Sequence, residues 1–225
     1  MTSDAAPTAT TAPAPSFDPA LTAAGDPDRL IGGSRGELVW SDPDSPLGLV
    51  ELRVLDPVAD LAALHGWIAQ PRSRFWGGLS ESTPDELREV YEFVDGLPTH
   101  HAFLASVDGT PVALLQTYQP EHDPVGDAYP VERGDVGIHL LIGARAGARI
   151  AGFSTLLGVS FAGFLFSRPA AERIVAEPDL RNEAAVTRAR LSGFELGPEI
   201  ELADKRAQLA FLTRARLDAL VARLA

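Results

Sequence analysis

The sequence contains no cysteine, few basic residues and no long uninterrupted apolar run. The absence of cysteine excludes disulfides, zinc thiolates, iron–sulfur clusters and a cysteine nucleophile, and we expect a reducing, cytoplasmic location. Lys and Arg number 19 against 31 Asp and Glu, so the formal net charge is −12. We expect no nucleic-acid partner, because that affinity depends on neutralising phosphates with basic side chains.

An uncharged stretch between Arg149 and Arg168 raises the question of a membrane span. A spanning helix needs about 20 mostly apolar residues, whereas glycine, serine and threonine interrupt this stretch repeatedly. We therefore predict a buried core helix there and no membrane span. The chain also begins without a basic segment or an apolar run, so we expect no secretory signal.

The 225 residues suit one domain with some additional chain. Residues 1–35 are rich in Ala, Pro and Thr, and such a composition buries too little apolar surface to offset the entropy of ordering. We interpret 1–35 as a flexible leader and 36–225 as a single domain. The alternative is that the few apolar side chains of the leader pack on the domain; these are Phe17, Leu21 and Leu30.

Apolar periodicity and turn signals divide the domain into strands and helices. Strands are expected over 38–40, 49–55, 102–107, 112–118, 135–142, 174–177, 194–202 and 207–212. Helices are expected over 58–68, 84–94, 149–166, 182–191 and 217–224. This order predicts an α/β fold with a mixed, mainly antiparallel central sheet and helices on both faces.

Two segments carry most of the chemical signal. In the first, a strand containing His139 leads through a Gly- and Ala-rich turn to a helix that begins near Arg149. A helix N-terminus presents free N–H groups, so this turn suits a pyrophosphate, although an ordinary packing turn has the same composition. In the second, Asp179 follows a strand end, where ligands bind in open α/β sheets. The alternative is that Asp179 only caps the next helix.

Together the two segments resemble the GNAT superfamily of N-acetyltransferases. The superfamily's phosphate loop, Arg/Gln-x-x-Gly-x-Gly/Ala, is similar to Arg149-x-x-Gly152-x-Ser154, with Ser in the last place. Its later signature, Asn-x-x-Ala followed by Gly-Phe, matches Asn182-x-x-Ala185 and Gly193-Phe194. The resemblance implies the GNAT acyl-CoA N-acyltransferase fold.

A narrower resemblance is to the siderophore branch of the superfamily, of the aerobactin, mycobactin and desferrioxamine type. It rests on Asp135-x-Gly137-x-His139 together with Glu177-Pro-Asp179-x-Arg181-Asn182. Enzymes of this branch acylate the side-chain amine or N-hydroxyamine of lysine, ornithine or similar diamines. Many other superfamily members carry a tyrosine that protonates the leaving thiolate; its place here is Ala189, and residues 182–194 contain no tyrosine. Proton transfer must therefore use other groups.

The resemblance implies roles for individual residues. His139 and Asp179 would be the catalytic pair, and Asn182 would face the cofactor near the thioester. The co-substrate would be acyl-CoA, either acetyl-CoA or succinyl-CoA, and no metal is expected. Its pantetheine arm would pair with the backbone of Leu140, Leu141 and Ile142, and its pyrophosphate would lie against Arg149, Ile150, Ala151, Gly152, Phe153 and Ser154.

Four side chains are candidates for binding the acceptor. Trp67 and Trp76 could flank an aliphatic diamine chain, or they could belong to the core. Arg74 could bind a substrate carboxylate through two hydrogen bonds, or it could be a solvated arginine. Tyr118 ends a strand beside the expected acceptor cleft, where packing is an equal alternative.

We predict an acyl-CoA-dependent N-acyltransferase that converts an N-hydroxylated ornithine, lysine or cadaverine side chain to a hydroxamate in siderophore biosynthesis. The partners that this implies are the small N-hydroxyamine and, as candidates, an acyl carrier protein or a siderophore synthetase. One alternative is a related acetyltransferase of another amine, such as an aminoglycoside or a protein N-terminus. The other is an inactive module that binds acyl-CoA or a carrier protein.

Overall fold

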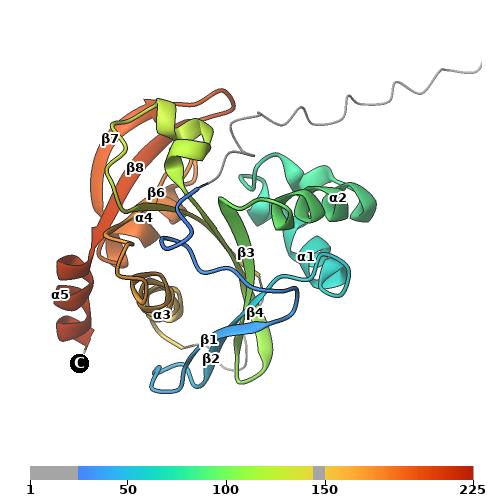
Figure 1. Cartoon of the computed structure of the whole chain (residues 1–225), viewed down its shortest axis with the longest axis horizontal. Helices are drawn as coiled ribbons and strands as arrows, with labels where there is room; N and C mark the ends of the chain where they lie inside the picture. Colours follow the sequence, from blue (N-terminus) through green and yellow to red (C-terminus); the bar gives the residue numbers. More distant parts are fainter. Residues whose placement is uncertain (1–24, 144–149, 225) are drawn as a thin grey trace, which may run out of the picture.

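A computed structural model describes residues 25–143 and 150–224. The described chain forms one eight-stranded sheet in the order β1-β2-β3-β4-β5-β6-β8-β7 (Figure 1). The strands are β1 (Leu38–Asp42), β2 (Val50–Val54), β3 (His100–Val107), β4 (Thr110–Tyr118), β5 (Asp135–Ile142), β6 (Arg173–Ala176), β7 (Glu195–Glu201) and β8 (Arg206–Thr213). All neighbouring pairs are antiparallel except β5 and β6, so the expected mixed, mainly antiparallel sheet is confirmed.

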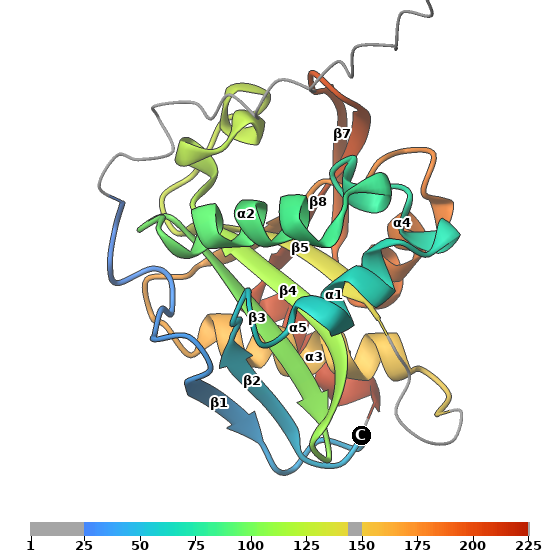
Figure 2. The ribbon, with the colours of Figure 1, turned by 90° about the vertical axis from the view of Figure 1, so that its right-hand side faces the viewer.

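Helices cover both faces of the sheet. They are α1 (Leu61–Ile68), α2 (Pro84–Asp95), α3 (Phe153–Phe166), α4 (Glu183–Leu191) and α5 (Arg214–Leu224). Helices α1 and α2 lie on one face, and α3 and α5 lie on the other (Figures 1 and 2). Short 3-10 turns occupy four connecting segments, at Pro71–Ser73, Leu79–Glu81, Pro120–His122 and Pro124–Asp127.

The parallel pair β5–β6 determines where the sheet opens. Residues 135–137 of β5 pair with 173–175 of β6, and there the pairing stops. Strand β5 continues to Ile142, still paired on its other side with β4, whereas β6 ends at Ala176. The edge of β5 that faces β6 is therefore open over residues 138–142.

Residues of β5 alternate between the two faces, as the period of a strand requires. Val136 is buried in the cluster that includes α3, and Ile138 and Leu140 pack against the same cluster. Leu141 is buried in the other cluster, with α1 and α2. His139, between Ile138 and Leu140, shares the parity of Leu141 and so faces the side covered by α1 and α2.

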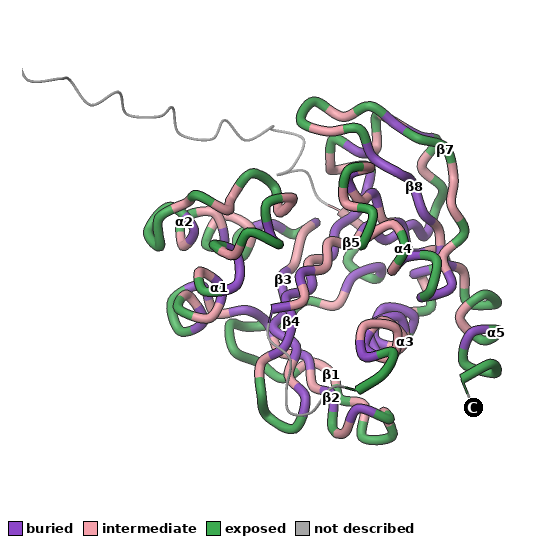
Figure 3. The backbone as a smooth tube through the Cα atoms, turned by 180° about the vertical axis from the view of Figure 1, so that it is seen from behind, coloured by how far each residue is buried: buried purple, intermediate pink, exposed green. Residues whose placement is uncertain are grey.

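Helix α3 is shorter than the sequence predicts. The expected helix covers 149–166, but α3 begins at Phe153, after Gly152 in a left-handed conformation with φ of 71°. The helix is 14 residues long and mostly buried against the sheet (Figure 3). No helix within residues 25–143 and 150–224 has the length and apolarity needed to cross a bilayer.

Part of the expected leader packs on the domain. Leu30 is 4% exposed and belongs to the core cluster that contains α3. The neighbouring Arg29 donates hydrogen bonds to Glu121 and to the carbonyl oxygen of Asp135. Leu30 thus follows the alternative that the sequence left open, while Phe17 and Leu21 lie outside the described residues.

Candidate active site

A cavity of about 460 Å³ opens where β5 and β6 diverge. Its lining comes from both faces of the sheet. Trp76 and Leu79 line it from the side of α1 and α2, and Ser154 and Gly158 line it from α3. Helix α4 and the turn between β7 and β8 close the remaining walls. The cavity therefore passes through the sheet at the divergence of β5 and β6.

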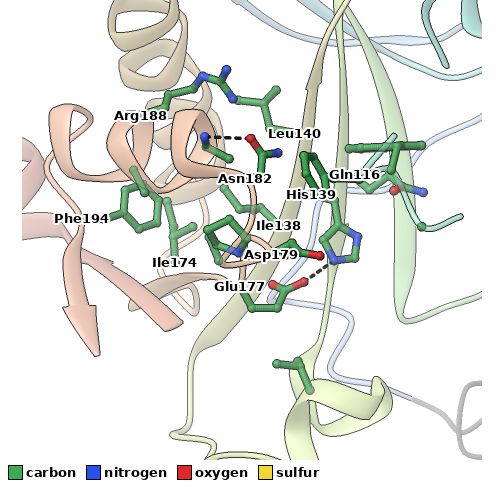
Figure 4. A pocket seen from close by; sticks show the side chains of 18 of the residues that line it. Gln116, Ile138, His139, Leu140, Ile174, Glu177, Asp179, Asn182, Arg188 and Phe194 are labelled. Atoms are coloured by element: carbon green, nitrogen blue, oxygen red, sulfur yellow. Dashed lines mark hydrogen bonds and ion pairs between the residues drawn. The ribbon is translucent and has the colours of Figure 1, made fainter. Parts of the chain in front are cut away.

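His139 and Glu177 form the central polar contact of this cavity. The distance from His139 Nε2 to Glu177 Oε1 is 2.6 Å (Figure 4). Glu177 directly follows β6 and continues the alternation of Val175, so it lies on the same face of the sheet as His139. The Glu177 side chain is 3% exposed and that of His139 is 37% exposed. A nearly buried carboxylate thus holds an imidazole that remains open to the cavity.

Two further side chains bind the same carboxylate. Tyr118 donates its hydroxyl hydrogen to Glu177 Oε2 over 2.8 Å. Lys205 Nζ, from the turn between β7 and β8, lies 3.3 Å from Glu177 Oε1. The Tyr118 ring reaches this position by lying over Gly137, where any β-carbon would come within 2.1 Å of the ring. Glycine at 137 is therefore a requirement of the site, because a side chain there would displace Tyr118.

The charges in this network shift the pKa values of both central groups. Burial disfavours the charged imidazolium, but the charge and hydrogen bond of Glu177 outweigh it, and the pKa of His139 is raised above its ordinary value. Burial likewise opposes ionisation of Glu177, yet the charge and hydrogen bond of His139, with Lys205, lower its pKa to about 2. Glu177 is thus an anion throughout the physiological range.

Asp179 lines the cavity but is not bound to His139. Its carboxylate accepts hydrogen bonds from the Arg181 side chain, at 2.6 Å from Nη2, and from the Arg181 backbone N–H. The hydrogen bond of Arg181 is the main reason that the pKa of Asp179 is lowered. The resemblance pairs Asp179 with His139 in catalysis; in the structure the carboxylate that binds the imidazole is that of Glu177.

The expected donor-binding residues fall into three groups. Leu140, Ser154 and Asn182 line the cavity, and Asn182 Oδ1 also accepts a hydrogen bond from the N–H of Ala185 as the cap of α4. Others lie nearby without lining it: Leu141 and Phe153 are buried, Ile142 is half-buried, and Ile150, Ala151 and Gly152 are exposed. Arg149 lies outside the described residues.

The expected acceptor-binding residues are only partly brought together. Trp76 lines the cavity, with its ring edge-on to His139 and its Nε1–H donated to the Tyr91 hydroxyl. Trp67 is buried in the core cluster with α1 and α2, and Arg74 is exposed and stacks on Phe75. Tyr118 is buried, with its ring centroid 5.0 Å from that of His139 and its hydroxyl on Glu177. The surroundings of Trp67 therefore match the alternative that it belongs to the core.

The site residues predicted from the sequence do not include Glu177, Lys205 or Arg188, all of which line the cavity. The sequence did offer one signal for Glu177: side chains two residues apart in an extended segment point to the same face of the sheet, so Glu177 shares a face with Val175. Lys205 had no local signal, because its proximity to Glu177 depends on how β8 folds back onto β6. No group of His, Cys, Asp and Glu side chains arranged to hold a metal ion occurs in the part of the chain that the structure describes.

Comparison with known proteins identifies the family. The model of the acetyltransferase (GNAT) domain matches residues 56–202, which include His139, Tyr118 and Glu177 and most of the residues that line the cavity. The fold and site thus define an enzyme that transfers an acyl group from acyl-CoA. The chain belongs to the GNAT acetyltransferase family.

Two curated relatives are similar to this chain at low identity. N(6)-hydroxylysine O-acetyltransferase of Escherichia coli is 26% identical over 170 residues, which cover 74% of this chain. The chain spans about half of that relative, 52% of its length. Lysine N-acyltransferase MbtK of Mycobacterium sp. (strain MCS) is 27% identical over 171 residues, covering 75% of this chain and 68% of the relative.

Solved structures share the fold. An uncharacterized protein from Bacillus halodurans superposes with a TM-score of 0.74 at 21% identity, covering 84% of this chain and 96% of the other. The aminoglycoside acetyltransferase AAC(6')-Ib, solved in complex with coenzyme A, gives a TM-score of 0.64 at 23% identity, covering 76% of this chain and 98% of the other. At these identities the likeness concerns the fold alone, and it agrees with the fold that the sequence predicts.

Proposed function

We propose that this enzyme acylates an N-hydroxylated amine to a hydroxamate, with acyl-CoA as donor. The observation that carries the proposal is the His139–Glu177 pair, which faces the cavity and resembles a base with its orienting carboxylate. The two curated relatives, named for their action on hydroxylysine and on lysine, support an aliphatic amine or N-hydroxyamine as the acceptor.

The hydrogen bond to Glu177 selects the tautomer of His139. In the neutral imidazole, Nε2 carries the hydrogen that it donates to the carboxylate, so Nδ1 has the free lone pair. The acceptor nitrogen attacks the thioester carbon, and Nδ1 takes the proton that this nitrogen loses. The carbon–sulfur bond then breaks, and the thiolate leaves with the electron pair. Holding the two substrates in this geometry supplies much of the rate.

The limited basicity of an imidazole favours an N-hydroxyamine over an alkylamine as the acceptor. A hydroxylamine nitrogen is far less basic than an alkylamine and reaches the site mostly uncharged. An alkylammonium must first lose a proton, and an imidazole of raised pKa is still too weak a base to remove it readily. An N-hydroxyamine needs only the one proton transfer that His139 can accept.

The open edge of β5 is where the donor fits. On the edge of β5 that faces β6, residues 138–142 have no strand partner, and residues 138–140 line the cavity, so an extended arm with amide groups can pair with this edge. Leu140 and Ser154 line the same wall. We place the pantetheine arm along this edge, with the thioester beside His139.

The test is thiol release from acetyl-, succinyl- and malonyl-CoA with N-hydroxylated ornithine, lysine and cadaverine, against the corresponding plain amines. We expect turnover with an N-hydroxyamine and a loss of about 10²–10⁴-fold in kcat for His139→Ala. The matched control is His65→Ala, which alters a half-buried histidine of α1 that does not line the cavity.

Each other result points to a different function. Faster turnover with plain amines would move the enzyme to the acetyltransferases of other amines and overturn the N-hydroxyamine proposal. CoA binding without turnover of any acceptor would favour a binding module. Full activity in His139→Ala would remove His139 as the base.

A further inference from the structure

Arg188 stands apart among the cationic side chains of the cavity. His139 and Lys205 both contact Glu177, whereas the guanidinium of Arg188 has no hydrogen bond or ion pair with any residue in 25–143 or 150–224. It lines the cavity from the second turn of α4 and is half-buried. Figure 4 shows it at the far end of the labelled group from His139, with Asn182 between them.

The surroundings of Arg188 leave its charge uncompensated. Burial disfavours the charged guanidinium and lowers the pKa of Arg188, but an arginine remains protonated at neutral pH. Removing a cation from water without a counter-charge costs free energy, so such a group is normally paired. An arginine that is half-buried at a cavity wall therefore indicates an anion that arrives with the ligand.

The position of Arg188 along α4 indicates which part of the ligand carries that anion. Arg188 follows Asn182 by six residues, which is about 9 Å along a helix axis. Asn182 and His139 bound the reacting end of the cavity, so Arg188 lies toward its other end. The small side chains of Ala185 and Ala189 on α4, with Gly158 on the facing helix, leave room beside it.

We propose that Arg188 binds a phosphoryl group of the acyl donor. The guanidinium presents paired N–H donors in a plane, which suits two phosphate oxygens at once. Coenzyme A and the phosphopantetheine arm of a carrier protein both offer this chemistry. The inference rests on the proposed function only in taking the cavity as the donor site, and it does not depend on the acceptor.

The first experiment removes the phosphate from the donor as well as the charge from the protein. We compare Arg188→Met, which keeps an apolar stem of similar length, and Arg188→Lys with the parent enzyme. The donors are acetyl-CoA and acetyl-pantetheine, which lacks phosphate. With acetyl-CoA, we expect KM to rise about tenfold or more in Arg188→Met and to recover partly in Arg188→Lys. With acetyl-pantetheine, KM should be equal in all three proteins.

The matched control is Arg190→Met, which alters an exposed arginine of the same helix that does not line the cavity. It should leave both KM values unchanged. If Arg188→Met weakens both donors equally, or weakens neither, Arg188 does not contact a phosphoryl group and the proposal is overturned. If Arg188→Met fails to fold, Arg188→Lys with the two donors still decides.

Further donors identify which phosphoryl group is bound. An effect of Arg188→Met that persists with acetyl-4′-phosphopantetheine places Arg188 at the phosphate that CoA shares with a carrier protein. An effect that disappears with acetyl-3′-dephospho-CoA places it at the 3′-phosphate, which only CoA carries. Both results support a phosphoryl contact.

Calorimetric binding of CoA separates this inference from the proposed function, because it needs no acceptor. A tenfold weaker Kd in Arg188→Met, with unchanged affinity for pantetheine, supports the phosphoryl contact even if no N-hydroxyamine is acylated. Unchanged CoA affinity, in a protein that does acylate an N-hydroxyamine, overturns the role of Arg188 and leaves the proposed function intact.

Discussion

Glu177 combines three contacts in one carboxylate. His139 and Lys205 meet one of its oxygens and Tyr118 meets the other, in a site that excludes most water from the carboxylate. Through these side-chain contacts, the single residue Glu177, which follows β6, links that strand to β4, β5 and the turn between β7 and β8. Its removal should change both the titration of His139 and the stability of the fold.

The first prediction concerns Glu177→Gln and pH. Glu177 has a pKa of about 2 when folded, so its contribution to stability is complete above its unfolded value, near 4.5, and is lost as pH falls toward 2. His139 has a raised pKa, so its contribution is complete below about 6.5 and is lost as pH rises through the folded value. The parent protein should exceed Glu177→Gln in Tm most between about pH 4.5 and 6.5.

Thermal unfolding of the two proteins from pH 4 to 9 checks this expectation. A Tm difference that stays constant over the range would contradict the ionic pair. The acid limb of kcat/KM should also move to lower pH in Glu177→Gln, because the charge that raises the pKa of His139 is gone.

Single residues also mark the limit of sequence reading. His139 was found because its strand and the following loop carry a pattern that can be recognised in a single sequence. The sequence paired His139 with Asp179 through the family resemblance, whereas the carboxylate that binds the imidazole is Glu177, two residues earlier, because spacing along a loop does not fix which side chain reaches the imidazole. Arg181 then holds Asp179 by local hydrogen bonds.

Helix α2 shows how local signals place an element correctly. Thr83 caps it, and a capping box joins Thr83 and Glu86 in both directions. The sequence predicted a helix over 84–94, and the helix covers Pro84–Asp95. The start of α3 was misplaced because it depends on the left-handed conformation of Gly152, which apolar periodicity does not report.

The second prediction is that Thr83→Ala lowers stability without altering catalysis. Loss of a helix cap costs about 1 kcal/mol, which corresponds to a fall in Tm of about 2–4 °C for a domain of this size. Helix α2 supports the acceptor side through Tyr91, whose hydroxyl accepts from Trp76, and this contact is several turns from the cap. Values of kcat and KM at 25 °C should therefore be unchanged.

Melting curves and steady-state kinetics of Thr83→Ala and the control Ser82→Ala test this expectation. Ser82 lies next to the cap, outside the helix, so its replacement should leave Tm unchanged. A fall in kcat for Thr83→Ala at equal folding would show that α2 acts on the reaction directly.

At the scale of the whole molecule, the sheet is joined weakly where the cavity lies. Only three residue pairs link β5 to β6, whereas six link β4 to β5. A donor arm along the open edge of β5 would bridge the two halves of the sheet. Composition and element order predicted the sheet. The point at which the sheet diverges was not predicted, because it depends on the end of β6 at Ala176, and that end is determined by strand pairing in three dimensions.

The third prediction is that CoA stabilises the protein and protects one region from hydrogen exchange. At a concentration about 100 times its Kd, a ligand adds about 2.7 kcal/mol, which corresponds to a rise in Tm of about 5–10 °C. Backbone amides of residues 138–142 should exchange more slowly, whereas those of β2 and β3 should not change. Equal protection across the sheet, or none, would contradict a donor bound at the divergence of β5 and β6.

Because the cavity lies where the sheet diverges, different elements line it on the two faces of the sheet. Trp76 and the segment before α2 line one side, and α3 and α4 line the other. Substitutions that fit a new amine can thus accumulate on the α1–α2 side without touching the contacts of the donor. The sheet separates the two sets of contacts, so specificity for the acceptor can change during evolution while specificity for the donor is retained.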